Sequence, residues 1–71
     1  MPRNRRLTTD LDFQEAMEQQ IPIRVFQDDL MIGSGGLIIR ITDSTIVTQS
    51  GVSELAYYER EACEFFEMER K

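Results

Sequence analysis

The sequence contains no histidine and no tryptophan, and its single cysteine is Cys63. Without histidine, the usual general base, the catalytic triads and the common Cys/His zinc sites are all missing. The acidic neighbours of Cys63, Glu61 and Glu64, would raise the pKa of its thiol, which disfavours a nucleophile. We therefore expect no enzyme, no catalytic, cofactor-binding or metal-binding residues, and a Cys63 that packs as a small core residue.

Long apolar runs are also missing. No segment approaches the roughly 20 apolar residues of a membrane-spanning helix. No positively charged segment leads into the apolar region of a signal peptide. Together with the single thiol, these absences predict a cytoplasmic protein without a membrane partner.

The chain has 71 residues, which predicts a single domain. A chain of this size buries only about 60% of the surface that its unfolded form exposes. Small domains of this kind are often stabilised by disulfides, a metal or a partner chain. Since one cysteine cannot form an internal disulfide and no zinc site is expected, we expect a homo-oligomer.

Charge is distributed unevenly along the chain. The formal net charge is −5, from 13 acidic and 8 basic residues. Arg3, Arg5 and Arg6 belong to residues 1–7, which we predict to be a flexible basic arm before a domain at residues 8–71. Without these three arginines, five basic residues face 13 acidic ones, a net charge of −8. Such an acidic body disfavours nucleic-acid binding over its surface.

A short helix is predicted over residues 8–20. Thr8, Thr9 or Asp10 can cap its first turn with a side-chain oxygen. Pro22 ends it, because the residue before a proline is disfavoured in the helical conformation. Apolar residues recur at near-helical spacing and predict a buried face: Leu11, Phe13, Ala16 and Met17.

Three β runs follow, over residues 21–27, 30–41 and 45–49. The first alternates, with Ile21, Ile23 and Val25 on one face, as in a sheet with one buried side. Short polar turns between the runs predict an antiparallel meander.

Glycines interrupt the second run at residues 33–36. These glycines have neither the spacing of a phosphate-binding loop nor the Lys-Ser/Thr that follows it. They therefore indicate a bulge or a bend that curves the strand.

The C-terminal residues 53–70 carry two competing patterns. Leu55, Tyr58, Ala62, Phe65 and Met68 share one face of a helix. The same segment also fits a hairpin of two aromatic-rich strands, over residues 52–58 and 63–68, around a charged turn.

One resemblance covers most of the chain. A short helix leads into Ile21-Pro22-Ile23, a strand carrying Gly36 leads to Asp43 before Ile46-Val47, and Val52-Ser53 precedes Tyr58 and an apolar strand. This order resembles the Sm-like proteins, in particular the bacterial Hfq type, and also related SH3-like small barrels. The resemblance implies a mostly β fold, with a short N-terminal helix before a strongly bent five-stranded antiparallel barrel that ends in the hairpin. The alternative is an α+β meander with a C-terminal helix.

The sequence also departs from this family. Glu59-Arg60 replaces the family's Lys-His pair, and residues 17–20 replace an arginine cluster late in the helix. The family's RNA-contacting chemistry therefore largely does not carry over. Assembly through strand edges depends on the backbone and can survive such changes.

These observations predict a non-enzymatic Sm-like binding or assembly module. It would self-associate through strand edges and bind a protein partner. The alternatives are binding of RNA or single-stranded nucleic acid through arginines and aromatic residues, and an acidic regulator that occupies a basic partner. The candidate contact residues are Arg3, Arg5, Arg6, Arg24, Arg40, Tyr57, Tyr58 and Arg60.

Overall fold

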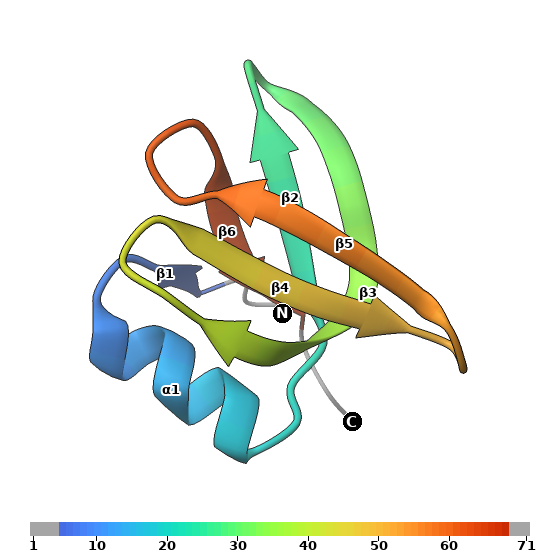
Figure 1. The fold of residues 1–71 in the computed structure, drawn as a ribbon. Coiled ribbons are helices and arrows are strands. Elements are labelled where there is room, and N and C mark those ends of the chain that lie inside the picture. Colours follow the sequence, from blue (N-terminus) through green and yellow to red (C-terminus); the bar gives the residue numbers. More distant parts are fainter. Residues whose placement is uncertain (1–4, 69–71) are drawn as a thin grey trace.

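The protein folds into one curved β-sheet with one short helix. The structure is a computed structural model, and it describes residues 5–68. The elements are β1 (Arg6–Leu7), α1 (Asp10–Glu18), β2 (Ile23–Gln27), β3 (Leu30–Ile41), β4 (Thr45–Ser50), β5 (Glu54–Glu59) and β6 (Glu64–Glu67). All six strands belong to one antiparallel sheet, in the order β1-β6-β2-β3-β4-β5 (Figure 1). The fold is thus mostly β, as the sequence predicts.

The sheet has one strand more than predicted, and it is not closed. Within residues 5–68, its end strands β1 and β5 do not pair with each other, so the five-stranded closed barrel is not confirmed. The additional strand is β1, which lies in the predicted flexible arm. Leu7 pairs with Phe65 and is buried in the core, which explains why Arg6 and Leu7 are held against β6.

Helix α1 begins with a capping box. The Thr9 side chain accepts a hydrogen bond from the Asp12 N–H (3.1 Å), and the Asp12 carboxylate accepts one from the Thr9 N–H (3.2 Å). Phe13 and Ala16 are buried, as predicted. Leu11 is 62% exposed, and its place on the buried face was wrong. Two residues span about 200° of helix, which turns Leu11 away from Phe13.

Asp12 makes the stability of α1 depend on pH. The backbone N–H groups of Thr8 and Thr9 donate to its carboxylate, Arg5 pairs with it, and these contacts hold its pKa well below the ordinary value of 3.8. Asp12 therefore contributes stability at pH values above 3.8, and this contribution is lost as the pH falls through and below that value. We expect Asp12→Asn to destabilise the protein at neutral pH and to converge with the unsubstituted protein in acid.

Thermal unfolding measured over a series of pH values checks this expectation. Glu18→Gln is the control, because it removes the same charge at the other end of α1. A constant difference in melting temperature between Asp12→Asn and the unsubstituted protein at all pH values would contradict the assigned role of Asp12.

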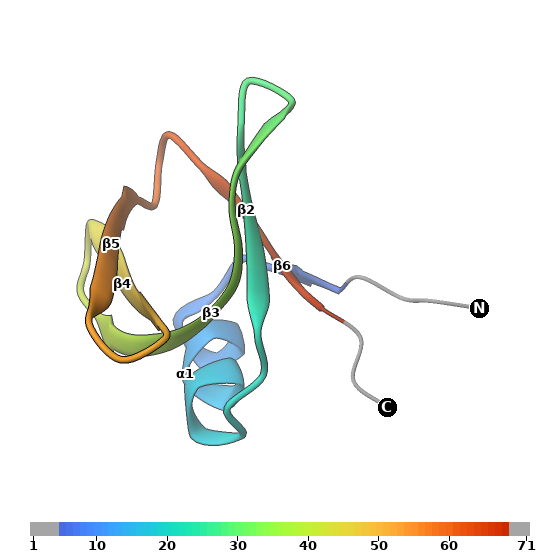
Figure 2. The same ribbon diagram turned by 90° about the vertical axis from the view of Figure 1, so that its right-hand side faces the viewer.

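Strand β3 bends because it carries three extra residues. Its pairing with β2 passes over Ile32 and Gly35, and its pairing with β4 passes over Ile39. Each such bulge bends and twists the strand that contains it. Gly35 has a φ of +88°, which suits glycine. The predicted bend at residues 33–36 is confirmed, and Figure 2 shows β3 curving from β2 toward β4.

The C-terminal segment forms strands rather than a helix, but it does not form the predicted hairpin. β5 pairs with β4, whereas β6 pairs with β2 and β1. The intervening turn thus carries the chain from one end of the sheet to a strand beside β2. The predicted hairpin was wrong because each strand pairs with a different earlier strand: β5 pairs with the edge of β4, and β6 pairs with the edge of β2.

The core lies between α1 and the concave side of the sheet. The Phe13 and Phe65 rings meet edge to face, with their centroids 5.3 Å apart. The predicted alternation of β2 is confirmed, since its inward residues and Ile21 are buried. The core residues are Leu7, Phe13, Ala16, Ile21, Ile23, Val25, Ile38, Ile46 and Phe65.

Candidate protein interface

Two of the predicted contact arginines, Arg60 and Arg5, bind acidic groups of α1. Arg60 donates to the Asp10 carboxylate (2.5 Å) and to the Thr42 carbonyl (2.7 Å), and its guanidinium lies 4.9 Å from the centre of the Phe13 ring. It thereby spans a hollow of about 540 Å³ beside the N-terminus of α1. Arg5 pairs with Asp12 at 2.6 Å and with two further carboxylates on α1 and β6. Both side chains therefore tie α1 to the sheet.

The remaining arginines do not form one basic patch. Arg6 and Arg24 lie on either side of Phe66 in the register of β1, β6 and β2. Arg6 pairs with Glu64 at 3.6 Å, whereas Arg24 has no acidic partner within residues 5–68. Arg40 is separate, on β3 opposite β4. Arg3 lies outside the described residues.

Tyr57 and Tyr58 point to opposite faces of β5. Tyr58 faces the core, where its ring meets that of Phe65 edge to face at 6.3 Å. Tyr57 is 69% exposed on the outer face, and Leu55 on the same face is 50% exposed. The two tyrosines therefore cannot act together as one stacking surface.

β5 also presents an unpaired backbone edge. The Arg60 N–H donates to the Ser44 carbonyl at 2.8 Å, which fixes the direction of the alternating hydrogen bonds between β5 and β4. Ala56 and Tyr58 therefore direct their backbone groups toward β4. Leu55 and Tyr57 direct theirs away from the sheet, and within residues 5–68 these groups have no partner.

The opposite end of the sheet offers a much shorter edge, because its end strand β1 has only two residues. β1 pairs along β6 at Phe65 and Phe66, and the Glu67 N–H donates to the Arg5 carbonyl at 2.8 Å. Exposed strand edges readily accept another strand, and proteins usually cover or charge them. The edge of β5 is therefore the best candidate for association with another chain.

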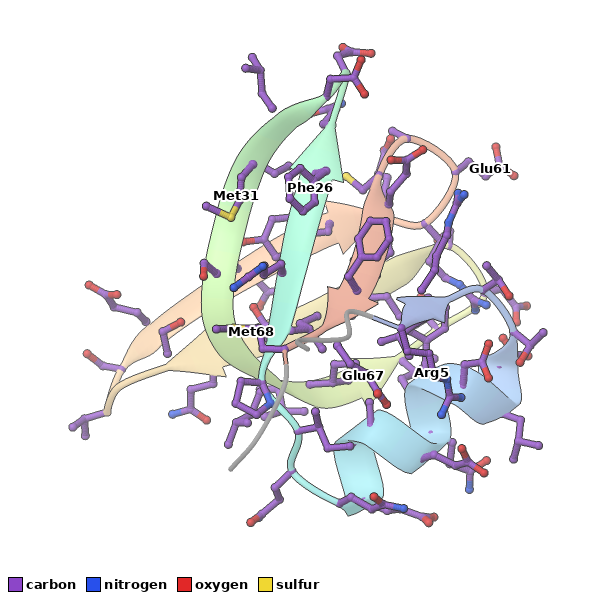
Figure 3. All side chains as sticks on the ribbon, turned by 180° about the vertical axis from the view of Figure 1, so that it is seen from behind. Arg5, Phe26, Met31, Glu61, Glu67 and Met68 are labelled. Atoms are coloured by element: carbon purple, nitrogen blue, oxygen red, sulfur yellow. The ribbon has the colours of Figure 1, made fainter. Side chains whose placement is uncertain are left out.

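Sequence reasoning missed several exposed apolar residues. Leu55 is one, and a second group, Leu30, Met31 and Ile32, follows the turn between β2 and β3. Figure 3 shows Met31 on this face beside the half-buried Phe26. The available signal was the run Leu30–Ile32 directly after a two-residue turn, because the tip of a hairpin rarely buries both of its faces.

The structure describes little that could support catalysis. Among residues 5–68, no three Cys, Asp or Glu side chains gather in a way that could hold a metal ion. Burial raises the pKa of the Cys63 thiol; the backbone of Glu59 lowers this pKa through a hydrogen bond, and the Glu59 charge raises it by less. The expected direction is confirmed, but its main cause is burial rather than the acidic sequence neighbours Glu61 and Glu64. No described helix has the length and apolar character needed to cross a membrane.

Comparison with protein-family models, with curated proteins and with solved structures finds no match. The functional argument therefore depends on the geometry of this chain.

Proposed function

We propose that the protein is a non-enzymatic assembly module that self-associates through the edge of β5 and also binds a protein partner. The observation that carries this proposal is the combination of free backbone groups and exposed apolar side chains at Leu55 and Tyr57. Pairing with another strand would give the free backbone groups hydrogen-bond partners and would cover the exposed apolar side chains.

The direction of the backbone groups restricts how two copies pair. In an antiparallel arrangement, outward-directed residues must face each other, and we propose the register in which Leu55 of one copy lies opposite Tyr57 of the other, because it pairs both outward-directed residues. This register gives two Leu55–Tyr57 side-chain pairs on the outer face and keeps Glu54 and Glu59 away from each other. It also leaves Glu59 out of the central pairs, which is favourable because its carbonyl already accepts from the N–H groups of Ala62 and Cys63.

The association is two-fold rather than ring-forming. A ring of Sm-like type would need a second free edge, at β6, to receive β5 of the next copy. That edge is covered by β1. Two copies joined through β5 instead make a closed pair in which the same surface is used twice.

We further propose that the fold is an open variant of the Sm-like or SH3-like small barrel. Its support is the short helix before a strongly bent central strand, together with the position of Tyr58 of β5. The Tyr58 ring meets Phe65 of β6 across the gap between these strands, and its hydroxyl lies beside Gly33 of β3.

Replacing Tyr57 by proline tests the proposed association. Proline removes the outward N–H and leaves the hydrogen bonds to β4 in place. We expect the self-association constant to fall by at least about tenfold, because a backbone hydrogen bond is lost and the proline ring obstructs the second strand. Light scattering coupled to size exclusion measures the mass of the complex over a range of concentrations.

Tyr57→Thr is the matched control, because it also removes the aromatic ring but keeps the N–H. It should associate more strongly than Tyr57→Pro. A monomer at high micromolar concentration for the unsubstituted protein, or equal association by the two variants, would overturn the proposal.

A further inference from the structure

The turn between β2 and β3 exposes three consecutive apolar residues. Leu30, Met31 and Ile32 are 69%, 54% and 43% exposed. Runs of this kind are unusual on a protein surface unless they serve binding. Figures 1 and 2 show that the tip of this hairpin projects beyond the other elements.

The local geometry explains why none of the three is covered. Met31 lies opposite Phe26 on the outer face, and Leu30 lies opposite Gln27 at the end of the hairpin. Ile32 is the bulged residue that the pairing with β2 passes over, so the bulge changes the direction of its side chain. Both faces of the tip are therefore apolar and open.

An aromatic surface continues from the tip across the back of the sheet. The rings of Phe26 and Phe66 meet edge to face, with their centroids 5.6 Å apart. They line a shallow hollow of about 290 Å³ together with Arg24, Asp29 and Glu64. Figure 3 shows Phe26 and Met31 side by side on neighbouring strands of this face.

Acidic groups surround the tip. Asp29 and Glu64 also line a second hollow of about 310 Å³, which extends to Asp28 and Glu61. Arg6 and Arg60 line it too, and Arg60 is paired with Asp10. Glu64 pairs with Arg6, but within residues 5–68 Asp28, Asp29 and Glu61 have no ion-pair partner. The unpaired charge around this surface is therefore mainly negative, with only Arg24 opposing it.

The turn residues are not the ones that its conformation favours. Asp28 and Asp29 have φ values of 53° and 65°, a turn for which Asn-Gly is the usual pair. Two adjacent carboxylates in this conformation bring strain and repulsion that an Asn-Gly turn would avoid. Basic side chains of a partner would offset the repulsion between these two carboxylates.

We infer that the hairpin tip docks an apolar segment of a partner protein that carries basic side chains. The partner's apolar side chains cover Leu30, Met31, Ile32 and Phe26, and its basic side chains meet Asp28 and Asp29. Nucleic acid and a second copy of this acidic tip are both repelled by these carboxylates. The surface differs from the edge used in the proposed association: it is formed by residues of β2, β3 and β6, whereas that edge consists of the outward backbone groups of β5.

A titration followed by NMR tests this inference. The probe is a short synthetic peptide of alternating leucine and lysine, and a leucine–glutamate peptide of the same length is its control. The titration uses Tyr57→Pro as well as the unsubstituted protein, because that variant removes strand addition at β5. We expect the backbone amide signals of Phe26 and Leu30–Ile32 to shift with the lysine peptide only, in both proteins.

Two sets of variants locate the binding energy. The double variant Met31→Ser, Ile32→Ser should lower the affinity by at least about tenfold, because burial of a large apolar side chain contributes that much. The double variant Asp28→Asn, Asp29→Asn should weaken binding and reduce its dependence on salt. Asp43→Asn, in the turn between β3 and β4, is the control. It should change neither the affinity for the lysine peptide nor the dependence of binding on salt.

Several results would overturn the inference. These are no shift with the lysine peptide, equal binding of the glutamate peptide, shifts confined to β5, and stronger shifts of the same amides by oligouridylate. A monomeric protein that still binds the lysine peptide at the tip would instead reject the proposed association and leave the docking surface in place.

Discussion

Replacing Phe65 by alanine is expected to lower the free energy of unfolding by about 3 to 5 kcal/mol. Phe65 is only 2% exposed, and its ring packs against Phe13 of α1 and Tyr58 of β5. A domain of this size has a total stability of about 4 to 10 kcal/mol, so this substitution should remove about a third or more of the total stability. Urea unfolding followed by circular dichroism measures the loss.

The neighbouring Phe66→Ala is the matched control. Successive residues of a strand point to opposite faces, and Phe66 lies half-buried on the outer face beside Phe26. We expect a loss of less than half that of Phe65→Ala. Equal losses for the two variants would contradict the assignment of β6 as a strand with one buried face.

Replacing Gly33 by alanine is expected to destabilise the protein by about 1 to 3 kcal/mol. A Cβ atom on Gly33 would overlap the Tyr58 hydroxyl oxygen and lie 3.0 Å from the ring carbon that carries it. The Tyr58 ring cannot easily move away, because it packs against the core and meets Phe65. For a domain of this size, the loss corresponds to a fall in melting temperature of roughly 4 to 8 °C per kcal/mol.

Tyr58→Phe should partly rescue Gly33→Ala, because it removes the oxygen that the new methyl group meets. A double-mutant cycle measured by thermal unfolding gives the coupling between the two sites. Gly35→Ala is the control: Gly35 has a φ of +88° and open space around it, so its cost is backbone strain that Tyr58→Phe does not relieve. Additive effects at Gly33 and Tyr58 would show that β5 does not pass over β3 at this point.

Local signals were sufficient for the start of α1, the alternation of β2 and the bend of β3. Thr9 begins α1 through hydrogen bonds with adjacent residues, as the sequence predicts. The helix ends at Glu18, before the stop predicted from Pro22, where Gln20 takes a positive φ and the Ile21 N–H donates to the Ala16 carbonyl. The alternation in β2 reflects one buried face, which depends on the period of the strand alone. The bend of β3 followed from its glycines, since few other residues accept the φ of Gly35.

Features that depend on pairing between distant residues could not be derived in this way. β1 has only two residues and shows no pattern of its own; Leu7 is held by β6, which comes almost sixty positions later. Each strand pattern at the C-terminus was right, but local propensity does not say which edge receives which strand. Ile32 and Ile39 are exposed because of bulges, which a strict alternation misplaces.

The candidate contact residues were predicted from their type, whereas the structure divides them by their surroundings. Arg60 and Arg5 belong to ion pairs with α1, so a positive charge in the sequence was no sign of an available contact. Tyr57 remains exposed while Tyr58 is packed, because neighbouring residues of a strand face opposite sides. The free backbone groups at Leu55 carry no signal in the sequence at all.

Hydrogen exchange of the β5 amides at low and high protein concentration tests the proposed association most directly. Ala56 and Tyr58 bond to β4 and should be protected at both concentrations. The N–H groups of Leu55 and Tyr57 should exchange rapidly in dilute protein and become protected as the concentration rises. Rapid exchange at these two residues at every concentration would contradict assembly through this edge.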